Sequence, residues 1–129
     1  GMRPCEVYAL DFDESGFVSI QTAKKKKWEN LETRRIPLHP AILPYIDKIR
    51  AALPVSLFLL ERAFHKHFPA DFRLYDLRHT FTTAAQQAHC YKSWVDYVTG
   101  HKGGANTTDR VYTHWEDDFQ REEMAKLEY

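Results

Sequence analysis

The sequence predicts a mainly α-helical α+β fold, with a small antiparallel β-hairpin or three-stranded sheet near the N-terminus. Two observations predict it. Apolar and polar residues alternate only in the N-terminal third, whereas apolar residues recur at helical spacing in most of the chain from residue 40 onward. The length of 129 residues suits a single domain that can bury a core.

The N-terminal third predicts a short helical start followed by β structure. Val18 and Ile20 alternate with polar neighbours, which is the pattern of a strand with one buried face. The turn sequence Glu14-Ser15-Gly16 precedes this strand, and residues 33–38 predict the strand that returns beside it. Residues 24–32 between the two strands predict a long polar hairpin tip.

Residues 40–70 predict two helices separated by Pro54. Pro40 can open the first helix, because proline is tolerated in an early helical position. The apolar residues at helical spacing in this first helix are Ile42, Ile46 and Ile49. The apolar residues expected on one face of the second are Leu57, Leu60, Ala63, Phe64 and Phe68.

The chain from residue 75 onward predicts three more helices. Asp76 is expected to cap the first of them, a second spans residues 91–99 and stops at Gly100, and a third covers 117–127. The stripe expected to be buried on the first is Leu77, Phe81, Ala84 and Ala88. The apolar residues of the last, amphipathic one are Phe119, Met124 and Leu127.

Charge alone does not assign a partner, because 18 basic residues balance 18 acidic residues. The distribution is uneven: four consecutive lysines (24–27) and Arg34-Arg35 are basic, whereas residues 116–128 are largely acidic. This asymmetry suits a protein with one DNA-facing side, and equally a solvated face followed by an acidic tail.

Localisation and redox state follow from what the sequence contains. It has no apolar run of the ~20 residues that a membrane span needs, and no secretory signal at its start, so we expect a cytoplasmic protein without a membrane partner. Cys5 and Cys90 have neither metal-type nor disulfide-type spacing, which predicts reduced thiols that serve mainly in packing.

Four residues stand out as candidates for a functional site. Arg78 lies next to a predicted core stripe, where an arginine is costly without an anionic partner. His101 follows a helix end, Tyr112 lies eleven residues further on, and Arg3 precedes Glu6 by three residues. Taken singly, each is explained more simply as an ion-paired, surface or packing residue.

Their order and spacing add a family resemblance. Three C-terminal segments resemble the C-terminal boxes of tyrosine recombinases of the phage-integrase type: Leu77-Arg78-His79-Thr80-Phe81-Thr82-Thr83, Thr99-Gly100-His101-Lys102 and Thr108-Asp109-Arg110-Val111-Tyr112-Thr113-His114. Residues 1–7 resemble the box that carries the first catalytic arginine. Residues 21–24 and 34–38 resemble the two strands of the β-hairpin that carries the catalytic lysine.

The resemblance implies site-specific DNA recombination or integration by strand cleavage and rejoining. Arg3 and Arg78 would clamp the scissile phosphate, and His101 would donate a hydrogen bond to it. Tyr112 would attack to form a 3′-phosphotyrosyl intermediate, and Lys24 would protonate the leaving 5′ oxygen. Double-stranded DNA would be the substrate, other recombinase subunits would be partners, and neither a metal nor a cofactor would be needed.

Further residues are assigned by the same resemblance. Lys26 is the second candidate for the catalytic lysine, since alternate side chains share one face of a strand. The family usually has histidine at the position of Tyr75, which is therefore a secondary catalytic candidate and weakens the expected activity. The residues expected to contact DNA are Lys25, Lys27, Lys102 and Arg110.

The resemblance covers residues 1–129 as one partial catalytic domain, without the N-terminal DNA-clamping domain of the family. We therefore expect the chain alone to be inactive and to form part of a longer integrase. The helix over 117–127 would pack either on a neighbouring subunit, as in many family members, or back onto its own domain.

Three other functions remain open. A topoisomerase would use the same chemistry, and a degenerate integrase remnant would keep the fold and weak DNA binding without catalysis. A helical interaction module without a DNA role is the third, and the ordered set of Arg3, Lys24, Arg78, His101 and Tyr112 argues against it.

Overall fold

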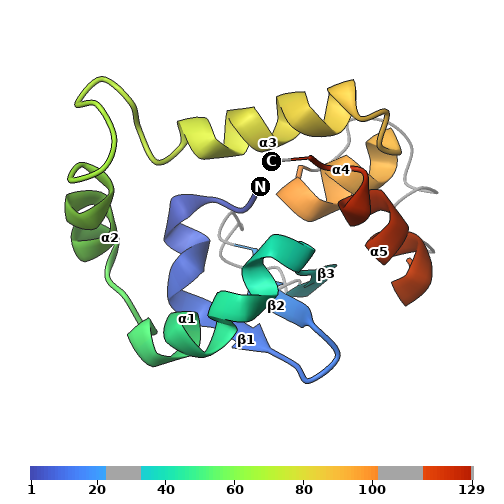
Figure 1. Ribbon diagram of the computed structural model, residues 1–129, viewed down its shortest axis with the longest axis horizontal. Helices are drawn as coiled ribbons and strands as arrows, with labels where there is room; N and C mark the ends of the chain where they lie inside the picture. Colours follow the sequence, from blue (N-terminus) through green and yellow to red (C-terminus); the bar gives the residue numbers. More distant parts are fainter. Residues whose placement is uncertain (23–32, 102–114, 129) are drawn as a thin grey trace, which may run out of the picture.

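The computed structural model describes residues 1–22, 33–101 and 115–128 (Figure 1). It confirms the predicted α+β class, because a three-stranded antiparallel sheet near the N-terminus is accompanied mainly by helices. In chain order the elements are η1 (Pro4–Ala9), β1 (Leu10–Phe12), β2 (Phe17–Gln21), β3 (Thr33–Pro37), η2 (Pro40–Tyr45), α1 (Ile46–Ala52), α2 (Leu57–Phe64), α3 (Asp76–Gln87), α4 (Lys92–Thr99) and α5 (Asp117–Ala125).

The sheet has the strand order β1-β2-β3, with β2 at its centre. Val18 of β2 pairs with Phe12 of β1 and Ile36 of β3, and the side chains of Val18 and Ile20 are buried as their alternation predicted. The predicted turn before β2 also forms, with Gly16 at a positive φ of 80° that few other residues adopt. Beyond β3, the amide of Leu38 donates to the Gly16 carbonyl, which closes this end of the sheet.

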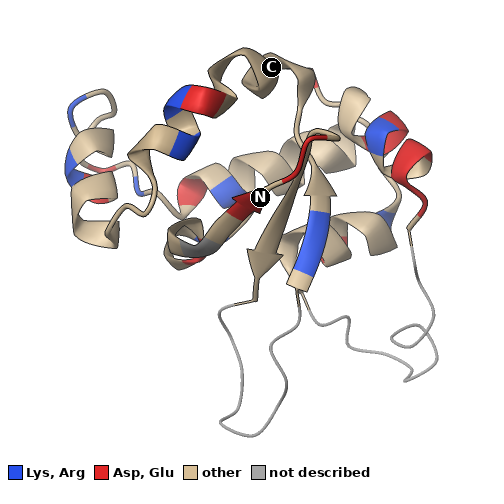
Figure 2. Cartoon of the chain, turned by 90° about the horizontal axis from the view of Figure 1, so that it is seen from below, with Lys and Arg blue, Asp and Glu red and all other residues tan. Residues whose placement is uncertain are grey.

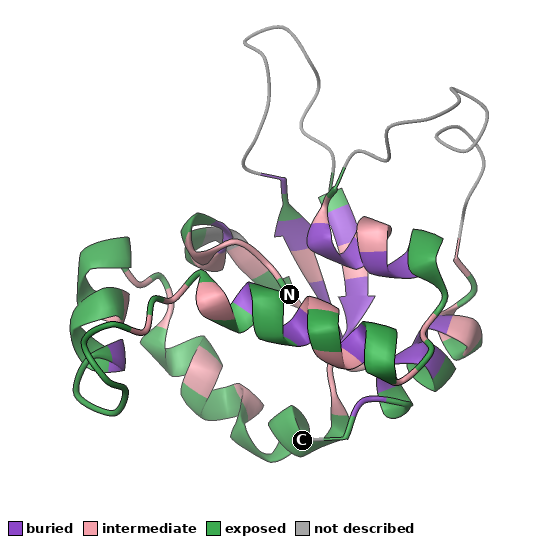
Figure 3. Cartoon of the chain, turned by 90° about the horizontal axis from the view of Figure 1, so that it is seen from above, coloured by how far each residue is buried: buried purple, intermediate pink, exposed green. Residues whose placement is uncertain are grey.

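The core lies between the sheet and the helices α3, α4 and α5. Figure 3 shows buried positions on the strands and on the inward sides of these helices, whereas α1 and α2 are mostly exposed. The buried core residues are Val18, Ile20, Ile36, Phe81, Ala85, Trp94, Val95, Val98, Met124 and Leu127. No helix in the described part of the chain is long and apolar enough to cross a membrane.

The predicted buried stripe of α3 is confirmed at Phe81, which is buried, and at Ala84 and Ala88, which pack partly buried against the core, but it is wrong at Leu77. Leu77 is 43% exposed, and the buried residues are Arg78, Phe81 and Ala85. These three positions lie on one face at the spacing i, i+3 and i+7. Arg78 therefore points into the protein rather than lying beside the stripe, which is the first indication that it has a specific role.

Asp76 does not cap α3 as expected. It is the first residue of the helix, and Tyr75 takes the capping position without a side-chain hydrogen bond. The Asp76 carboxylate instead accepts hydrogen bonds from the amide and the guanidinium of Arg73. The bend before α3 is thus held by a local Asp–Arg pair.

The two helices predicted for residues 40–70 are present as α1 and α2 on either side of Pro54, but the first starts differently from the prediction. It begins as the 3-10 helix η2, because Pro44 lacks the amide hydrogen that a continuous α-helix would need. Of the residues of α2, only Phe64 is buried, so most of its apolar residues remain at least partly exposed. Leu57 and Phe68 are each 42% exposed. α2 lies at the opposite end of the molecule from α5, away from the core (Figure 1).

The other predicted helices are present. Gly100 ends α4 in the left-handed conformation, with φ 62°, as expected. α5 folds back onto its own domain, which is one of the two predicted arrangements. Leu127 is buried in the core, and its carbonyl oxygen lies 2.9 Å from Nε2 of His39. The Glu123 carboxylate accepts a hydrogen bond from the amide of Tyr91 at 2.7 Å.

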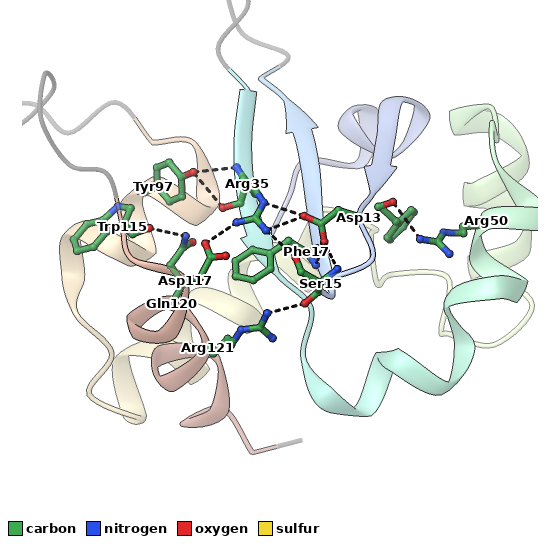
Figure 4. A network of polar contacts seen from close by, with 11 residues as sticks. Asp13, Ser15, Phe17, Arg35, Arg50, Tyr97, Trp115, Asp117, Gln120 and Arg121 are labelled. Carbon is green, nitrogen blue, oxygen red and sulfur yellow. Dashed lines mark hydrogen bonds and ion pairs between the residues drawn. The ribbon is translucent and has the colours of Figure 1, made fainter.

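Arg35 of β3 joins the sheet to α5 (Figure 4). Its guanidinium lies 3.8 Å from the centroid of the Phe17 ring and pairs with Asp13 at 2.9 Å and with Asp117 at 2.6 Å. The hydroxyl of Tyr97 in α4 accepts a hydrogen bond from the Arg35 amide. One side chain and its backbone thus hold together the β1–β2 turn, α4 and the first turn of α5.

Asp13 is the acidic partner in this network whose titration is most strongly affected. Burial alone would raise its pKa, but hydrogen bonds from the Ser15 hydroxyl, the Phe17 amide and the Arg35 guanidinium lower it to about 2. Because the pKa is lower in the folded chain than in the unfolded chain, this contribution to stability is present above about pH 4 and is lost as the pH falls toward 2.

Asp13→Asn should therefore lower the free energy of unfolding by about 1 kcal/mol at pH 7, the usual magnitude for a hydrogen bond to a charged group on a partly exposed site. The difference from the wild type should shrink as the pH falls from 4 to 2, which urea denaturation at several pH values would measure. Glu14→Gln removes the neighbouring exposed charge and should have no such effect. A constant difference over this pH range would contradict the role of the Asp13 charge.

Candidate functional site

The candidate site is built around the carboxylate of Glu6, which is fully buried. Its Oε2 accepts a hydrogen bond from the amide of Arg3 at 2.8 Å, and its Oε1 pairs with Nη1 of Arg3 at 3.0 Å. Arg34 of β3 approaches the same carboxylate, with Nη2 2.8 Å from Oε2 and Nη1 3.4 Å from Oε1. One negative charge thus lies between two guanidinium groups.

Arg3 also contacts the C-terminal end of α4. Its Nη2 donates a hydrogen bond to the carbonyl of Gly100 at 3.1 Å, where the helix dipole favours a positive charge. Gly100 passes so close to the arginines that a Cβ atom there would lie 2.6 Å from Nη1 of Arg34 and 3.3 Å from Nη1 of Arg3. The helix end and the two arginines therefore require glycine at this position.

Arg78 brings a third guanidinium group to this site. It is 3% exposed, and its Nη1 donates a hydrogen bond to the Gly1 carbonyl at 2.8 Å. Its Nη2 is buried and has no hydrogen-bond partner among the residues that the structure describes. Burial lowers the pKa of Arg78, and the nearby positive charge of Arg3 lowers it further. A buried donor without a partner is costly, and an anion would satisfy it.

His101 lies in the electrostatic field of the same arginines. Burial lowers its pKa, and the positive charges of Arg78 and then Arg3 contribute to the shift, against the opposing effect of Asp96. The ring is therefore neutral at pH 7. Its Nδ1 lies 3.2 Å from Oγ1 of Thr99.

The Thr99 hydroxyl determines which tautomer of His101 this contact favours. Thr99 is fully buried, and its hydroxyl lies 2.8 Å from the Val95 carbonyl and 3.2 Å from the Asp96 carbonyl, both of which can only accept, so its single proton is donated to the backbone. In the contact with His101, the threonine oxygen then accepts a hydrogen bond from Nδ1–H. The neutral ring consequently keeps its free lone pair on Nε2, which can accept a proton.

Of the sequence-predicted catalytic residues, the structure brings Arg3, Arg78 and His101 together. Tyr75 lies near Arg78 but is 41% exposed, and its ring makes an edge contact with His79, with centroids 5.2 Å apart. The remaining candidates lie outside the described residues: Lys24, Lys25, Lys26, Lys27, Lys102, Arg110 and Tyr112.

Sequence reasoning did not assign Glu6 or Arg34 to the site, although both were noticed. A signal for Arg34 was available in the alternation of β3. Arg34 is in phase with Ile36, so it belongs to the buried face of the strand, where a charged residue needs a specific partner. β3 is also the strand of the sheet that carries basic residues (Figure 2). For Glu6, the hint was its spacing of three residues from Arg3.

Among the described residues, the site carries more positive than negative charge. The three guanidiniums of Arg3, Arg34 and Arg78 face the single carboxylate of Glu6. Within residues 1–22, 33–101 and 115–128, no three His, Cys, Asp or Glu side chains gather in a way that could hold a metal ion. The chemistry that these groups offer is the binding of an anion by paired N–H donors.

Comparison of the chain with protein-family models, with curated proteins and with solved structures gives no match.

Replacing Arg78 by methionine should raise the pKa of His101, because one of the positive charges that disfavour the imidazolium form is removed. Titration of the histidine ring protons by NMR would measure the midpoint. Arg73→Met is the control, because Arg73 pairs locally with Asp76 and does not contribute to the shift of His101. An unchanged midpoint in the Arg78 variant would show that the two groups are not neighbours.

Replacing Gly100 by alanine should lower the free energy of unfolding by more than about 1 kcal/mol, because a left-handed backbone disfavours a Cβ atom. It should also displace the two arginines. Gly16→Ala is the matched control, since Gly16 likewise has positive φ but its Cβ would meet Leu43 at an ordinary 3.6 Å. Thermal unfolding measures the strain in both. Only Gly100→Ala should also shift the side-chain NMR signals of Arg3 and Arg34, and unchanged arginine signals in that variant would argue against the close packing at Gly100.

Proposed function

We propose that this chain carries the phosphate-binding and strand-transfer centre of a DNA recombinase that uses a tyrosine nucleophile. The observation that carries the proposal is the convergence of Arg3, Arg78 and His101 from three separate parts of the chain. They meet at the end of α4, which is the order and combination that the resemblance to tyrosine recombinases requires. The same resemblance adds Lys24 and Tyr112.

The arginines would hold the scissile phosphate of double-stranded DNA. Arg78 has a buried nitrogen that lacks a partner among the described residues. Arg3 uses one nitrogen for Glu6 and another for Gly100, which leaves further N–H groups. Both guanidiniums stay charged throughout the reaction. They would therefore stabilise the negative charge that accumulates on the phosphate oxygens in the transition state.

The reaction would exchange one phosphate ester for another. The phenol oxygen of Tyr112 attacks phosphorus, the bond to the 5′ oxygen breaks, and a 3′-phosphotyrosyl link forms. Lys24 protonates the leaving 5′ oxygen. Rejoining is the reverse: a 5′ hydroxyl attacks the phosphotyrosyl group and releases the tyrosine.

His101 is suited to receive the phenol proton. In the neutral ring that the lowered pKa favours, Nδ1–H is directed to Thr99 and Nε2 has a free lone pair. The sequence-based expectation was a hydrogen bond from His101 to the phosphate, which would need a second N–H and hence the protonated ring. The geometry supports the role of proton acceptor better at neutral pH.

Tyr112→Phe should abolish a covalent protein–DNA adduct, because the nucleophilic oxygen is removed. To avoid assuming a recognition sequence, the substrate would be a pool of nicked duplexes with random sequence around the nick. Adducts would be detected on denaturing gels. Arg78→Lys should reduce their rate of formation about 100-fold, the magnitude usual for losing one transition-state donor. Tyr91→Phe is the matched control, because Tyr91 is 57% exposed and lies away from the arginines.

The same assay separates the main alternative. An adduct that persists in Tyr112→Phe would refute the assigned nucleophile. Binding of the duplex pool that depends on Arg78, without any adduct in the wild type, would instead support a remnant that binds DNA without cutting it. Tyr75 favours this second candidate to some degree, because a tyrosine at that position cannot act as a base near neutral pH as histidine can.

The proposed partners are double-stranded DNA and further recombinase subunits. In the single chain, α5 is held in place by its own domain through Met124, Leu127 and the Arg35–Asp117 ion pair. Exchange of α5 between subunits, if it occurs in assembly on DNA, would have to break these contacts.

A further inference from the structure

We propose that Arg34 is a positioning residue of the phosphate site, which acts through Glu6 on Arg3. This inference rests on the proposed phosphate site and adds to it a residue that the catalytic set inferred from the sequence does not contain. Arg34 lies on β3, and its guanidinium pairs with the same Glu6 carboxylate as Arg3 does. The following contacts show how it would control which groups Arg3 can bind.

The first step is that Arg3 and Arg34 share the Glu6 carboxylate. Each of its two oxygens faces both arginines: Oε1 is 3.0 Å from Nη1 of Arg3 and 3.4 Å from Nη1 of Arg34, and Oε2 accepts from the Arg3 amide and from Nη2 of Arg34, both at 2.8 Å. The Arg3 guanidinium therefore has only one close contact with this carboxylate. Arg34 takes the position from which a paired, two-bond contact could otherwise form.

The second step is the fixed position of Arg34 itself. Its side chain is 5% exposed, and its Nη1 also donates to the Thr22 hydroxyl at 2.5 Å. The same nitrogen lies against the backbone of Gly100, where a Cβ would approach within 2.6 Å. Arg34 is thus held by Thr22 just after β2, by η1 and by the end of α4, and it cannot follow Arg3 if that side chain moves.

The third step concerns charge. The single negative charge of Glu6 can balance only one of the two guanidiniums beside it. Because Arg34 is fixed in place, we assign that balance to Arg34. The positive charges of Arg3 and Arg78 then remain available to bind an anion. Without Arg34, the buried carboxylate would lose one of the two guanidiniums that pair with it among the described residues, and a buried charge strongly favours full pairing. Arg3 would turn to Glu6 and lose affinity for phosphate.

The test measures the affinity for inorganic phosphate in five variants of the full chain, Arg78→Lys among them, followed through the Nε–Hε signals of the arginines by NMR. Arg34→Met should weaken binding about tenfold, the equivalent of one hydrogen bond to a charged group. The double variant Glu6→Gln with Arg34→Met should restore affinity to within about threefold of the wild type, because the charge that would capture Arg3 is also gone. A residue that served only stability would not be rescued in this way.

Two further variants complete the design. Arg35→Met is the matched control: it changes the neighbouring arginine of the same strand, should lower the melting temperature through loss of the Asp13 and Asp117 pairs, and should leave phosphate affinity unchanged. Arg34→Lys serves if Arg34→Met does not fold. It keeps a positive charge but cannot engage both carboxylate oxygens as a guanidinium does, so affinity should fall about threefold to tenfold.

The outcomes separate this inference from the proposed function. If Arg34→Met, or Arg34→Lys where the methionine variant does not fold, binds phosphate as the wild type does while Arg78→Lys does not, Arg34 has no positioning role and the phosphate site stands. If the double variant is as weak as Arg34→Met, Arg34 acts directly or only through stability, and the route through Glu6 is wrong. If the wild type shows no binding that depends on Arg78, the phosphate site and this inference both fall.

Discussion

The buried carboxylate of Glu6 is the constraint on which the candidate site depends. A charge removed from water is tolerated only if opposite charges and hydrogen bonds surround it, and here the two guanidiniums of Arg3 and Arg34 do so. Through these pairs, one side chain links η1, β3 and, by way of the Gly100 carbonyl, the end of α4. The three segments are far apart in sequence, so the site can exist only once the sheet and the helices have assembled. Removing either arginine would leave the carboxylate under-compensated and would change the site and the local packing together.

The adjacent arginines of β3 illustrate how a strand can serve two purposes. Because side chains alternate across a strand, Arg34 points to Glu6 and the end of α4, whereas Arg35 points to Phe17, Asp13 and Asp117. The Arg34 pair is buried and assembles the site, and the Arg35 network is partly exposed and holds the start of α5. Both depend on the same register between β2 and β3. A shift of that register by one residue would exchange the two faces and disrupt the site and the attachment of α5 at once.

The sequence predicted the features that depend on local chemistry. The alternation around Val18 and Ile20 identified β2, and Gly100 marked the end of α4, because a strand face and a left-handed helix stop each leave a local pattern. It failed where the outcome depends on distant partners. Periodicity alone favoured Leu77 as a buried residue of α3, but Arg78 is buried instead, with its Nη1 bound by the distant Gly1 carbonyl. The convergence of Arg3, Arg78 and His101 was anticipated only through family resemblance, and the pairing of Glu6 with Arg34 across 28 residues had no local signature.

The arrangement around His101 shows how one set of positive charges can serve two steps of the proposed reaction. Burial and, after it, the positive charges of Arg78 and Arg3 lower the pKa of His101 and so favour its neutral ring. The same charges would stabilise an anionic phenolate and the anionic phosphate. The positive charges that lower the proton affinity of His101 also lower that of an attacking tyrosine. Proton transfer from the tyrosine to the histidine therefore remains feasible beside the cations. Thr99 completes the arrangement from within α4, because its buried hydroxyl directs Nδ1–H inward and leaves Nε2 as the acceptor.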